Sequence, residues 1–269
     1  MDLKLKDKVV LVTGGTRGIG HAIARRAAEE GAHVGICGRT KETLEAAVRS
    51  LSSLGVKVHG EQVDVLAPGG VEQFVEAAAK ALGRVDGLVA NVGGTFGGNF
   101  LETTPEDWVK TLEVNLVHAA RLIRAGAPHL QASGGGSAVI IASISGSRPG
   151  PRPQYGASKA AEIALAASLG RELASLKIRV NTVSPGSILF EGGSWAKRVK
   201  EMPERIADFV EREFPWGRMG TLDEVADVVT FLLSPRASWV SGTDVVVDGA
   251  QKTPSVSLSP RGGEGRGEG

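Results

Sequence analysis

The stretch VVLVTGGTRGIG at residues 9–20 decides which fold the rest of the chain is expected to follow. Val9–Val12 is a short apolar run of the kind that is buried in a parallel sheet. A glycine-rich turn follows at once, and a helical pattern continues from His21 to Glu30. Glycines let a backbone approach a pyrophosphate, whose charge then meets the helix N-terminus. The G-x-x-x-G-x-G spacing between strand and helix therefore predicts a dinucleotide-binding turn.

Strand and helix patterns alternate along the remainder of the chain. This alternation predicts one α/β domain over residues 1–250, a Rossmann-like, doubly wound parallel sheet in a three-layer α/β/α arrangement. Residues 187–216 are amphipathic and rich in aromatic side chains. The further strands are expected at His33–Cys37, Val56–Val63, Val85–Ala90, Ala138–Ala142, Ile178–Val183 and Asp244–Val247. The further helices are expected at residues 41–54, 70–82, 106–130, 154–176 and 221–234.

Polar or turn-forming residues directly follow the apolar strand runs. The carboxyl ends of parallel strands share one edge of the sheet, and ligands bind along that edge. Unrelated residues would not be expected to fall there repeatedly, so this edge is the predicted functional site. The residues in question are Thr13, Gly38, Asp64, Asn91, Ser143 and Pro185.

An arginine stands at the end of the second strand. An acidic residue there would hold the ribose 2′-hydroxyl of NAD, whereas an arginine suits the 2′-phosphate of NADP. Gly38 occupies the position of the acid, Arg39 follows it, and Arg17 lies in the first turn. The sign of the charge therefore predicts NADP as the cofactor. The alternative is that Arg39 is only a solvated residue at the start of a helix.

The segment YGASK at residues 155–159 contains the only tyrosine in the chain. In a helix, Tyr155 and Lys159 project from one face, one turn apart. A free phenol has a pKa of about 10, and roughly 4 kcal/mol of differential stabilisation brings it to about 7. A nearby ammonium stabilises the phenolate, so the pair predicts a proton donor and acceptor that works near neutral pH. The alternative is a surface tyrosine that packs against a lysine stem.

Composition excludes several other classes of protein. A chain of 269 residues with 42% hydrophobic content can bury a core, and its net charge of +1 favours neither a nucleic-acid nor a membrane partner. The lone Cys37 and the charged first residues, which resemble no signal peptide, suggest a reducing cytoplasm. The scattered histidines predict no metal site. Residues 251–269 are polar and rich in glycine, serine and proline, and we expect a disordered tail without chemistry.

Taken in order, these motifs resemble those of the short-chain dehydrogenase/reductase family, and its 3-oxoacyl reductase-like branch in particular. The resemblance covers about residues 5–250. It implies hydride transfer between a nicotinamide and a carbonyl or secondary alcohol. It also implies four catalytic residues, Ser143, Tyr155, Lys159 and Asn115. From the residues alone, Asn115 would be a tolerated polar residue inside a helix; the resemblance makes it the holder of a proton-relaying water.

In this family Ser143 would bond the carbonyl oxygen, Tyr155 would protonate it, and Lys159 would hold ribose hydroxyls and stabilise the phenolate. The resemblance also suggests a homotetramer built on the two long helices. With the turn and strand-end residues above, the expected cofactor contacts are Thr13, Gly14, Thr16, Arg17, Gly18, Ile19, Gly20, Arg39, Asp64, Val65, Asn91, Gly93, Tyr155, Lys159, Pro185, Gly186 and Ile188.

The chain departs from the family pattern in three places. After Pro185-Gly186 the run is Ser-Ile-Leu-Phe, without the threonine that often grips the carboxamide, so this contact is expected from the Ile188 backbone. The segment before Pro215 looks longer than in ketoacyl-carrier-protein reductases and suggests a different lid. The arginines with which those reductases dock an acidic carrier are missing. The expectation is therefore an NADP(H)-dependent ketone reductase, with a 3-oxoacyl thioester reductase, a sugar or polyol dehydrogenase and a non-catalytic NADP-binding regulator as alternatives.

Overall fold

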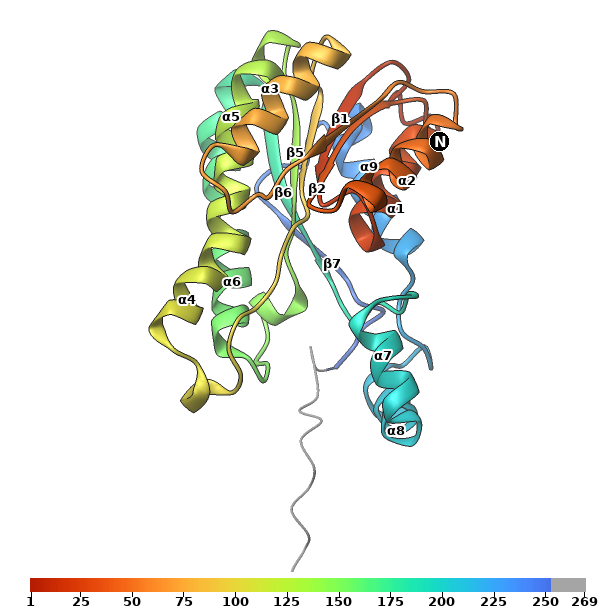
Figure 1. Ribbon diagram of the computed structural model, residues 1–269, viewed down its shortest axis with the longest axis vertical. Helices are drawn as coiled ribbons and strands as arrows, with labels where there is room; N and C mark the ends of the chain where they lie inside the picture. The colour runs from red at the N-terminus through yellow and green to blue at the C-terminus, as the bar shows by residue number, and fades with distance from the viewer. Residues whose placement is uncertain (253–269) are drawn as a thin grey trace, which may run out of the picture.

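The computed structural model describes residues 1–252, and the remainder of the expected tail, 253–269, lies outside the described residues. A parallel seven-stranded sheet forms the centre of the molecule, in the order β3-β2-β1-β4-β5-β6-β7 (Figure 1). This confirms the predicted doubly wound sheet. Its strands are β1 (Val9–Thr13), β2 (His33–Gly38), β3 (Val58–Gln62), β4 (Gly87–Ala90), β5 (Gly136–Ile141), β6 (Ile178–Pro185) and β7 (Asp244–Val247).

Helices cover both faces of the sheet. In Figure 1, α1, α2 and α9 lie on one side, and α3, α5 and α6 lie on the other. Each set buries its own apolar cluster against the sheet, which gives the three layers expected from the strand–helix alternation. The helices are α1 (Gly18–Glu29), α2 (Lys41–Ser52), α3 (Gly70–Leu82), α4 (Pro105–Leu112), α5 (His118–Ala132), α6 (Pro153–Glu172), α7 (Ser194–Glu201), α8 (Pro203–Glu213) and α9 (Leu222–Leu233).

The sheet places the predicted site residues at one edge. The order of the strands reverses between β1 and β4, which are direct neighbours with Val12 opposite Val89. A crevice forms where the crossovers from such a pair run to opposite faces of the sheet. The residue after β4 is Asn91, and Ser143 lies two residues beyond β5. The carboxyl ends of β1, β4, β5 and β6 therefore meet around this reversal, as the sequence predicts.

The long helix expected over residues 106–130 forms, but one π-type turn interrupts its regular α-helical hydrogen bonds. It consists of α4, a wider π-type turn (η2, Glu113–Val117) and α5. Asn115 explains the interruption, because its side-chain Nδ2 donates to the Thr111 carbonyl at 2.7 Å. That carbonyl would otherwise accept the backbone N–H of residue 115 in a regular helix. The expected helix therefore forms over its whole length, and its hydrogen-bond pattern changes to the π type at the residue that the site uses.

The segment 187–216 contains two helices, α7 and α8, which extend beyond the carboxyl edge of the sheet (Figure 1). They have a small apolar core of their own. The rings of Trp195 and Phe209 stack with their centroids 5.2 Å apart, and Phe214 meets Phe209 edge-on at 5.5 Å. Because aromatic pairs contribute about 0.5–1.5 kcal/mol beyond area burial, this segment is ordered by its own side chains.

The packed domain continues past residue 250. Gln251, which the sequence assigns to the tail, is 1% exposed and exchanges hydrogen bonds with Ser187. Gln251 therefore packs against the body of the domain. Within residues 1–252, no helix is long and apolar enough to cross a bilayer.

Candidate active site

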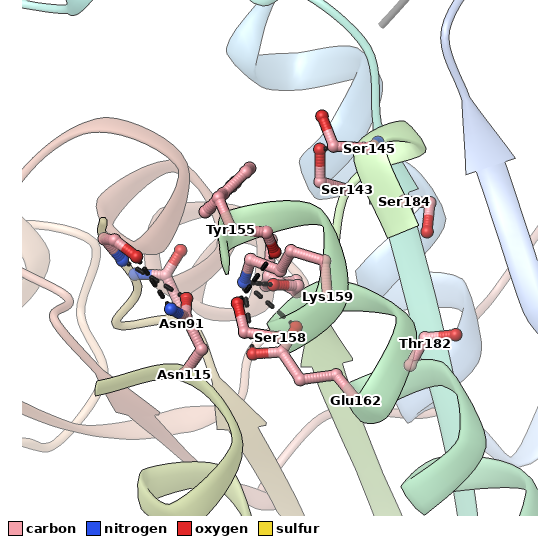
Figure 2. Close-up of polar contacts among 12 residues, drawn as sticks. Asn91, Asn115, Ser143, Ser145, Tyr155, Ser158, Lys159, Glu162, Thr182 and Ser184 are labelled. Atoms are coloured by element: carbon pink, nitrogen blue, oxygen red, sulfur yellow. Dashed lines mark hydrogen bonds and ion pairs between the residues drawn. The ribbon is translucent and has the colours of Figure 1, made fainter. Parts of the chain in front are cut away.

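Tyr155 and Lys159 lie on the first two turns of α6, which begins with Pro153 at its first position. The Lys159 ammonium is 5.7 Å from the centroid of the Tyr155 ring. The lysine is 2% exposed, whereas the tyrosine is half-buried. In Figure 2 the phenol and Ser143 point to the same side, and the ammonium lies beneath the phenol. The helix therefore brings the two side chains together as their spacing predicts.

The Lys159 ammonium is held from several sides. Its Nζ donates to the Ile141 carbonyl at 2.9 Å and to both carboxylate oxygens of Glu162 at 3.0 and 3.1 Å. Burial lowers the pKa of Lys159, but the charges of Glu162 and Tyr155 and the hydrogen bond to Glu162 outweigh it, so the pKa is raised. Lys159 is therefore cationic at neutral pH although it is out of contact with water.

Ser143 follows β5 and begins the short turn η3 (Ile144–Gly146). Its Oγ accepts a hydrogen bond from the backbone N–H of Ser145 at 3.1 Å. A hydroxyl can accept and donate at the same time, so this bond orients Ser143 and leaves its proton for another acceptor. The half-buried Ser143 can thus donate to an oxygen at the carboxyl edge.

Asn115 lies beneath the loop that follows β4. Its Nδ2 donates to the carbonyl of Gly94 at 2.7 Å as well as to Thr111, and its Oδ1 accepts from the N–H of Gly94 at 3.2 Å. A Cβ on Gly93 would come within 2.8 Å of the Asn115 Oδ1 and 3.1 Å of the Lys159 Nζ. Gly93 therefore allows the loop to lie directly against both side chains, and Asn115 keeps it there.

The turn between β1 and α1 has the geometry of an anion cradle. Gly14 and Gly18 have φ values of +65° and +57°, which favour glycine. A Cβ on Gly20 would lie 2.4 Å from the Gly14 carbonyl oxygen, so this glycine is needed for the turn itself. No side chain caps α1, and its first turn carries no acid. Its open N–H groups and dipole fit a dinucleotide pyrophosphate.

These features have counterparts in known proteins. A family model described as Enoyl-(Acyl carrier protein) reductase matches residues 14–250. Dehydrogenase/reductase SDR family member 4 of Homo sapiens is 38% identical over 255 residues, which cover 93% of this chain and 89% of the relative. Isoepoxydon dehydrogenase patN of Aspergillus clavatus is 35% identical over 250 residues, 91% of this chain and 95% of the relative. The chain is a short-chain dehydrogenase/reductase.

Solved structures of short-chain dehydrogenase/reductases superimpose on most of the chain. L-sorbose reductase from Gluconobacter frateurii, complexed with NADPH and L-sorbose, matches with a TM-score of 0.89 and 34% identity over 94% of this chain and 99% of the other. A 7α-hydroxysteroid dehydrogenase complexed with NADH and 7-oxo glycochenodeoxycholic acid matches with a TM-score of 0.87 and 29% identity, covering 95% and 98%.

The predicted cofactor residues Thr13 and Asn91 lie inside the site and bind other parts of the chain. The Thr13 hydroxyl donates to the Val89 carbonyl and accepts from the Asn91 N–H, and the residue is fully buried. The Asn91 amide donates to the carbonyls of Thr13 and Gly14. His118 approaches the same hydroxyl with Nε2 at 3.0 Å. These side chains tie β4 and α5 to the glycine turn and hold its shape.

At the expected 2′-phosphate position, Arg39 and Arg17 are both exposed. The Arg39 backbone is held by Gln62, whose Nε2 donates to its carbonyl at 3.0 Å. Gly38 packs closely on the first turn, because a Cβ there would lie 2.5 Å from the Thr16 methyl carbon. Position 38 therefore has little room for a side chain.

On the adenine side, the structure places both expected residues in the turn after β3. Asp64 is exposed, and its carboxylate accepts from the Leu66 N–H at 3.0 Å. Val65 is buried, and its carbonyl accepts from Arg121 at 3.1 Å. Arg121 also forms an ion pair with Glu72 on α3, so this turn is braced by a side chain that the sequence does not single out.

The loop after Pro185 is supported by the C-terminal segment. The Ser187 N–H donates to the Gln251 side chain at 2.9 Å, and the Gly186 N–H donates to the Val247 carbonyl. Ile188 is 5% exposed and pairs with Gly220 as an isolated bridge. Phe190 places its ring against Gly18, where a Cβ would lie 3.1 Å from the ring. The lid and the glycine turn therefore meet at this phenylalanine.

Sequence reasoning missed two buried residues of α6 that border the site. Gln154 is buried, and its Nε2 donates to the carbonyls of Phe96 and Gly98 at 3.0 and 3.3 Å, so it holds the loop between β4 and α4. Glu162 is the partner of Lys159. An acid three residues after the lysine in an alanine-rich helix is a signal from which Glu162 could have been predicted.

Two cavities border these elements in the described part of the chain. The larger, of about 650 Å³, is lined by residues at the amino ends of the strands, including Val10, Gly136 and Ile178, and lies away from the catalytic side chains. The smaller, of about 310 Å³, is lined by Ile188, Trp216 and other residues at the carboxyl edge. Neither lining includes Ser143, Tyr155 or Lys159, so neither cavity is assigned to the catalytic side chains.

Proposed function

We propose that this short-chain dehydrogenase/reductase interconverts a ketone and a secondary alcohol with NADP(H). The observation that carries the proposal is the half-buried phenol of Tyr155 beside a buried, cationic Lys159. Binding alone needs no activated phenol, so this pair speaks against a non-catalytic regulator. A bound nicotinamide would supply the hydride.

The chain's residues would handle the oxygen and its proton. Ser143 would donate a hydrogen bond to the carbonyl oxygen, with its own acceptor position used by Ser145. Tyr155 would give that oxygen a proton in reduction and take it back in oxidation. Lys159 would stabilise the phenolate, and Asn115 would keep the loop at Gly93–Gly94 against the ammonium.

Charge supports NADP as the preferred cofactor. Arg39 and Arg17 are exposed at the end of β2 and in the first turn, and no carboxylate stands at position 38 to repel a phosphate. The L-sorbose reductase to which the chain is similar was solved with NADPH, although the similar 7α-hydroxysteroid dehydrogenase was solved with NADH.

Among substrates, a sugar or polyol is the second candidate, and the similarity to L-sorbose reductase favours it. A carrier-bound 3-oxoacyl thioester is less well supported, because the residues before β5 are Gly134 and Gly135 and η4 (Leu173–Leu176) is followed by a single Lys177. We also propose a cytoplasmic homotetramer. In its support, the exposed face of α6 carries small side chains such as Ala157, Ala160 and Ala164, which let another helix approach closely.

Tyr155→Phe tests the proposal. The variant should bind NADPH within a few-fold of wild type and lose most turnover, because only the proton source is removed. NADPH consumption with a panel of ketoses, other ketones and 3-oxoacyl thioesters measures turnover, and cofactor fluorescence measures binding. A variant that keeps half of the wild-type rate would refute the acid/base role of Tyr155.

A further inference from the structure

Glu162 is a buried acid to which the proposed hydride-transfer chemistry assigns no role. Its side chain is 2% exposed, it lies one turn after Lys159 on α6, and both of its oxygens contact the Lys159 Nζ (Figure 2). Replacing a buried ion pair by apolar residues is often neutral or stabilising, so stability alone is a weak reason for a carboxylate here. The Lys159 Nζ of this pair lies 5.7 Å from the centroid of the Tyr155 ring, which suggests a different reason.

The ammonium needs this partner in order to stay charged. A fully buried lysine without a counter-ion loses about 3–5 units of pKa to desolvation. Burial is also the largest influence on the pKa of Lys159, and the pKa is raised only because Glu162 and Tyr155 oppose it. For Glu162, burial raises the pKa more than the charge of Lys159 and its hydrogen bond lower it, so the net pKa is raised. The lysine therefore offsets only part of the burial cost of this carboxylate, whereas the carboxylate and the phenol together more than offset that of the lysine.

The same contacts set the position of the ammonium. The Ile141 carbonyl accepts from Nζ at 2.9 Å on the β5 side, and Glu162 accepts from the side of α6. The backbone of Gly93 also lies close, since a Cβ on Gly93 would lie 3.1 Å from Nζ. The three contacts leave the lysine head 5.7 Å from the phenol ring centroid, and only the Glu162 contact involves an opposite charge.

No other ionised side chain described around this pair replaces Glu162. His118 of α5 has its pKa lowered to about 3 by burial and by the charges of Lys159 and Arg121, so it is neutral above that pH. The other titratable groups lie on elements that pack against α6 but are exposed or bonded elsewhere. They are Glu106, Asp107 and Lys110 of α4, Glu113 of η2 and Arg179 of β6.

We propose that Glu162 is a positioning residue whose carboxylate holds the Lys159 ammonium in place and charged beside Tyr155. The inference rests on the proposed function of that tyrosine. In wild type, the raised pKa of Lys159 keeps a positive charge beside the phenol. Without the carboxylate, burial would favour the neutral lysine, and that positive charge would be lost.

Glu162→Gln tests this in the protein without cofactor. Because Tyr155 is the only tyrosine, the ultraviolet absorbance of phenolate reports its titration alone. The midpoint should move to higher pH by roughly 1–3 units, the effect of losing an adjacent opposite charge. Glu172→Gln, on the exposed face of the same helix, is the matched control and should leave the midpoint unchanged. In a Lys159→Met background, Glu162→Gln should have no effect on the midpoint.

A midpoint that stays in place or moves to lower pH in Glu162→Gln would overturn the proposal. Circular dichroism and thermal unfolding establish whether the variant folds. Should it not fold, Glu162→Met supplies an uncharged side chain of similar length that suits an apolar interior, and the same upward shift is expected. A measurement of turnover distinguishes the proposed role of Glu162 from the proposed function of the enzyme. A fixed midpoint in an enzyme that reduces ketones refutes only the role of Glu162, and a shifted midpoint in a protein without turnover refutes only the proposed function.

Discussion

Arg39→Ala should weaken NADP binding and leave NAD binding nearly unchanged. A 2′-phosphate carries up to two negative charges, and a guanidinium can pair with it through two parallel hydrogen bonds. A hydrogen bond to a charged group contributes roughly 1.5–3 kcal/mol. Arg39 is exposed, so solvent screening puts the loss near the lower end of that range. About 1.4 kcal/mol corresponds to a tenfold rise in the Kd for NADP.

The structure also limits which substitutions can change the cofactor preference from NADP to NAD. An acid at position 38 would repel the phosphate and accept from the free ribose hydroxyl. However, a Cβ on Gly38 would lie 2.5 Å from the Thr16 methyl carbon and 3.3 Å from its hydroxyl oxygen. We therefore expect Gly38→Asp to be tolerated best together with Thr16→Ser, which removes the methyl group. Combined with Arg39→Ala, these changes should favour NAD.

Calorimetric Kd values for both cofactors, measured at one fixed salt concentration, test this prediction. Arg49→Ala is the control, because Arg49 is an exposed arginine further along α2 and its loss changes the net charge equally. It should leave both Kd values unchanged. If wild type binds NAD as tightly as NADP and Arg39→Ala alters neither affinity, Arg39 is a solvated helix-start residue and the preference for NADP is wrong.

Two further predictions concern stability. Asn115→Ala leaves the carbonyl of Gly94 without its side-chain donor, at about 1–3 kcal/mol for an unsatisfied group, whereas the Thr111 carbonyl can accept the backbone N–H of residue 115 instead; urea unfolding should show a clear loss, and an unchanged midpoint would contradict the bracing role of Asn115. The pKa of Glu224 is lowered to about 2, chiefly by its hydrogen bond from Arg218 and then by the Thr221 N–H. Because the folded pKa lies below the unfolded value of about 4.5, Glu224 stabilises the fold above that pH, and the contribution disappears as pH falls through about 2. Glu224→Gln should flatten the acid side of the plot of melting temperature against pH, whereas Glu211→Gln, on α8, should not.

Local patterns were enough to predict much of this protein. The strand, turn and helix of residues 9–30 identify the cofactor turn, and the four-residue spacing of Tyr155 and Lys159 places both on one face of α6. The strand-end rule also brought Thr13, Asn91 and Ser143 to one edge of the sheet, because parallel strands share a direction. Each of these inferences depends on backbone periodicity, which neighbouring residues determine.

Tertiary structure decided what the side chains do at that edge. Asn115 places a π-type turn inside a long helix, because a carbonyl four residues earlier and a loop from β4 both accept from its amide. Thr13 and Asn91 form hydrogen bonds that hold the glycine turn. Gln251 accepts a hydrogen bond from Ser187 and so supports a loop that lies 64 residues away in sequence. Glu162 is an ordinary helical acid in the sequence and becomes a buried counter-ion only when β5 and the loop at Gly93 close around Lys159. Burial sets the charge of such a group, and burial is produced by residues that are distant in the chain.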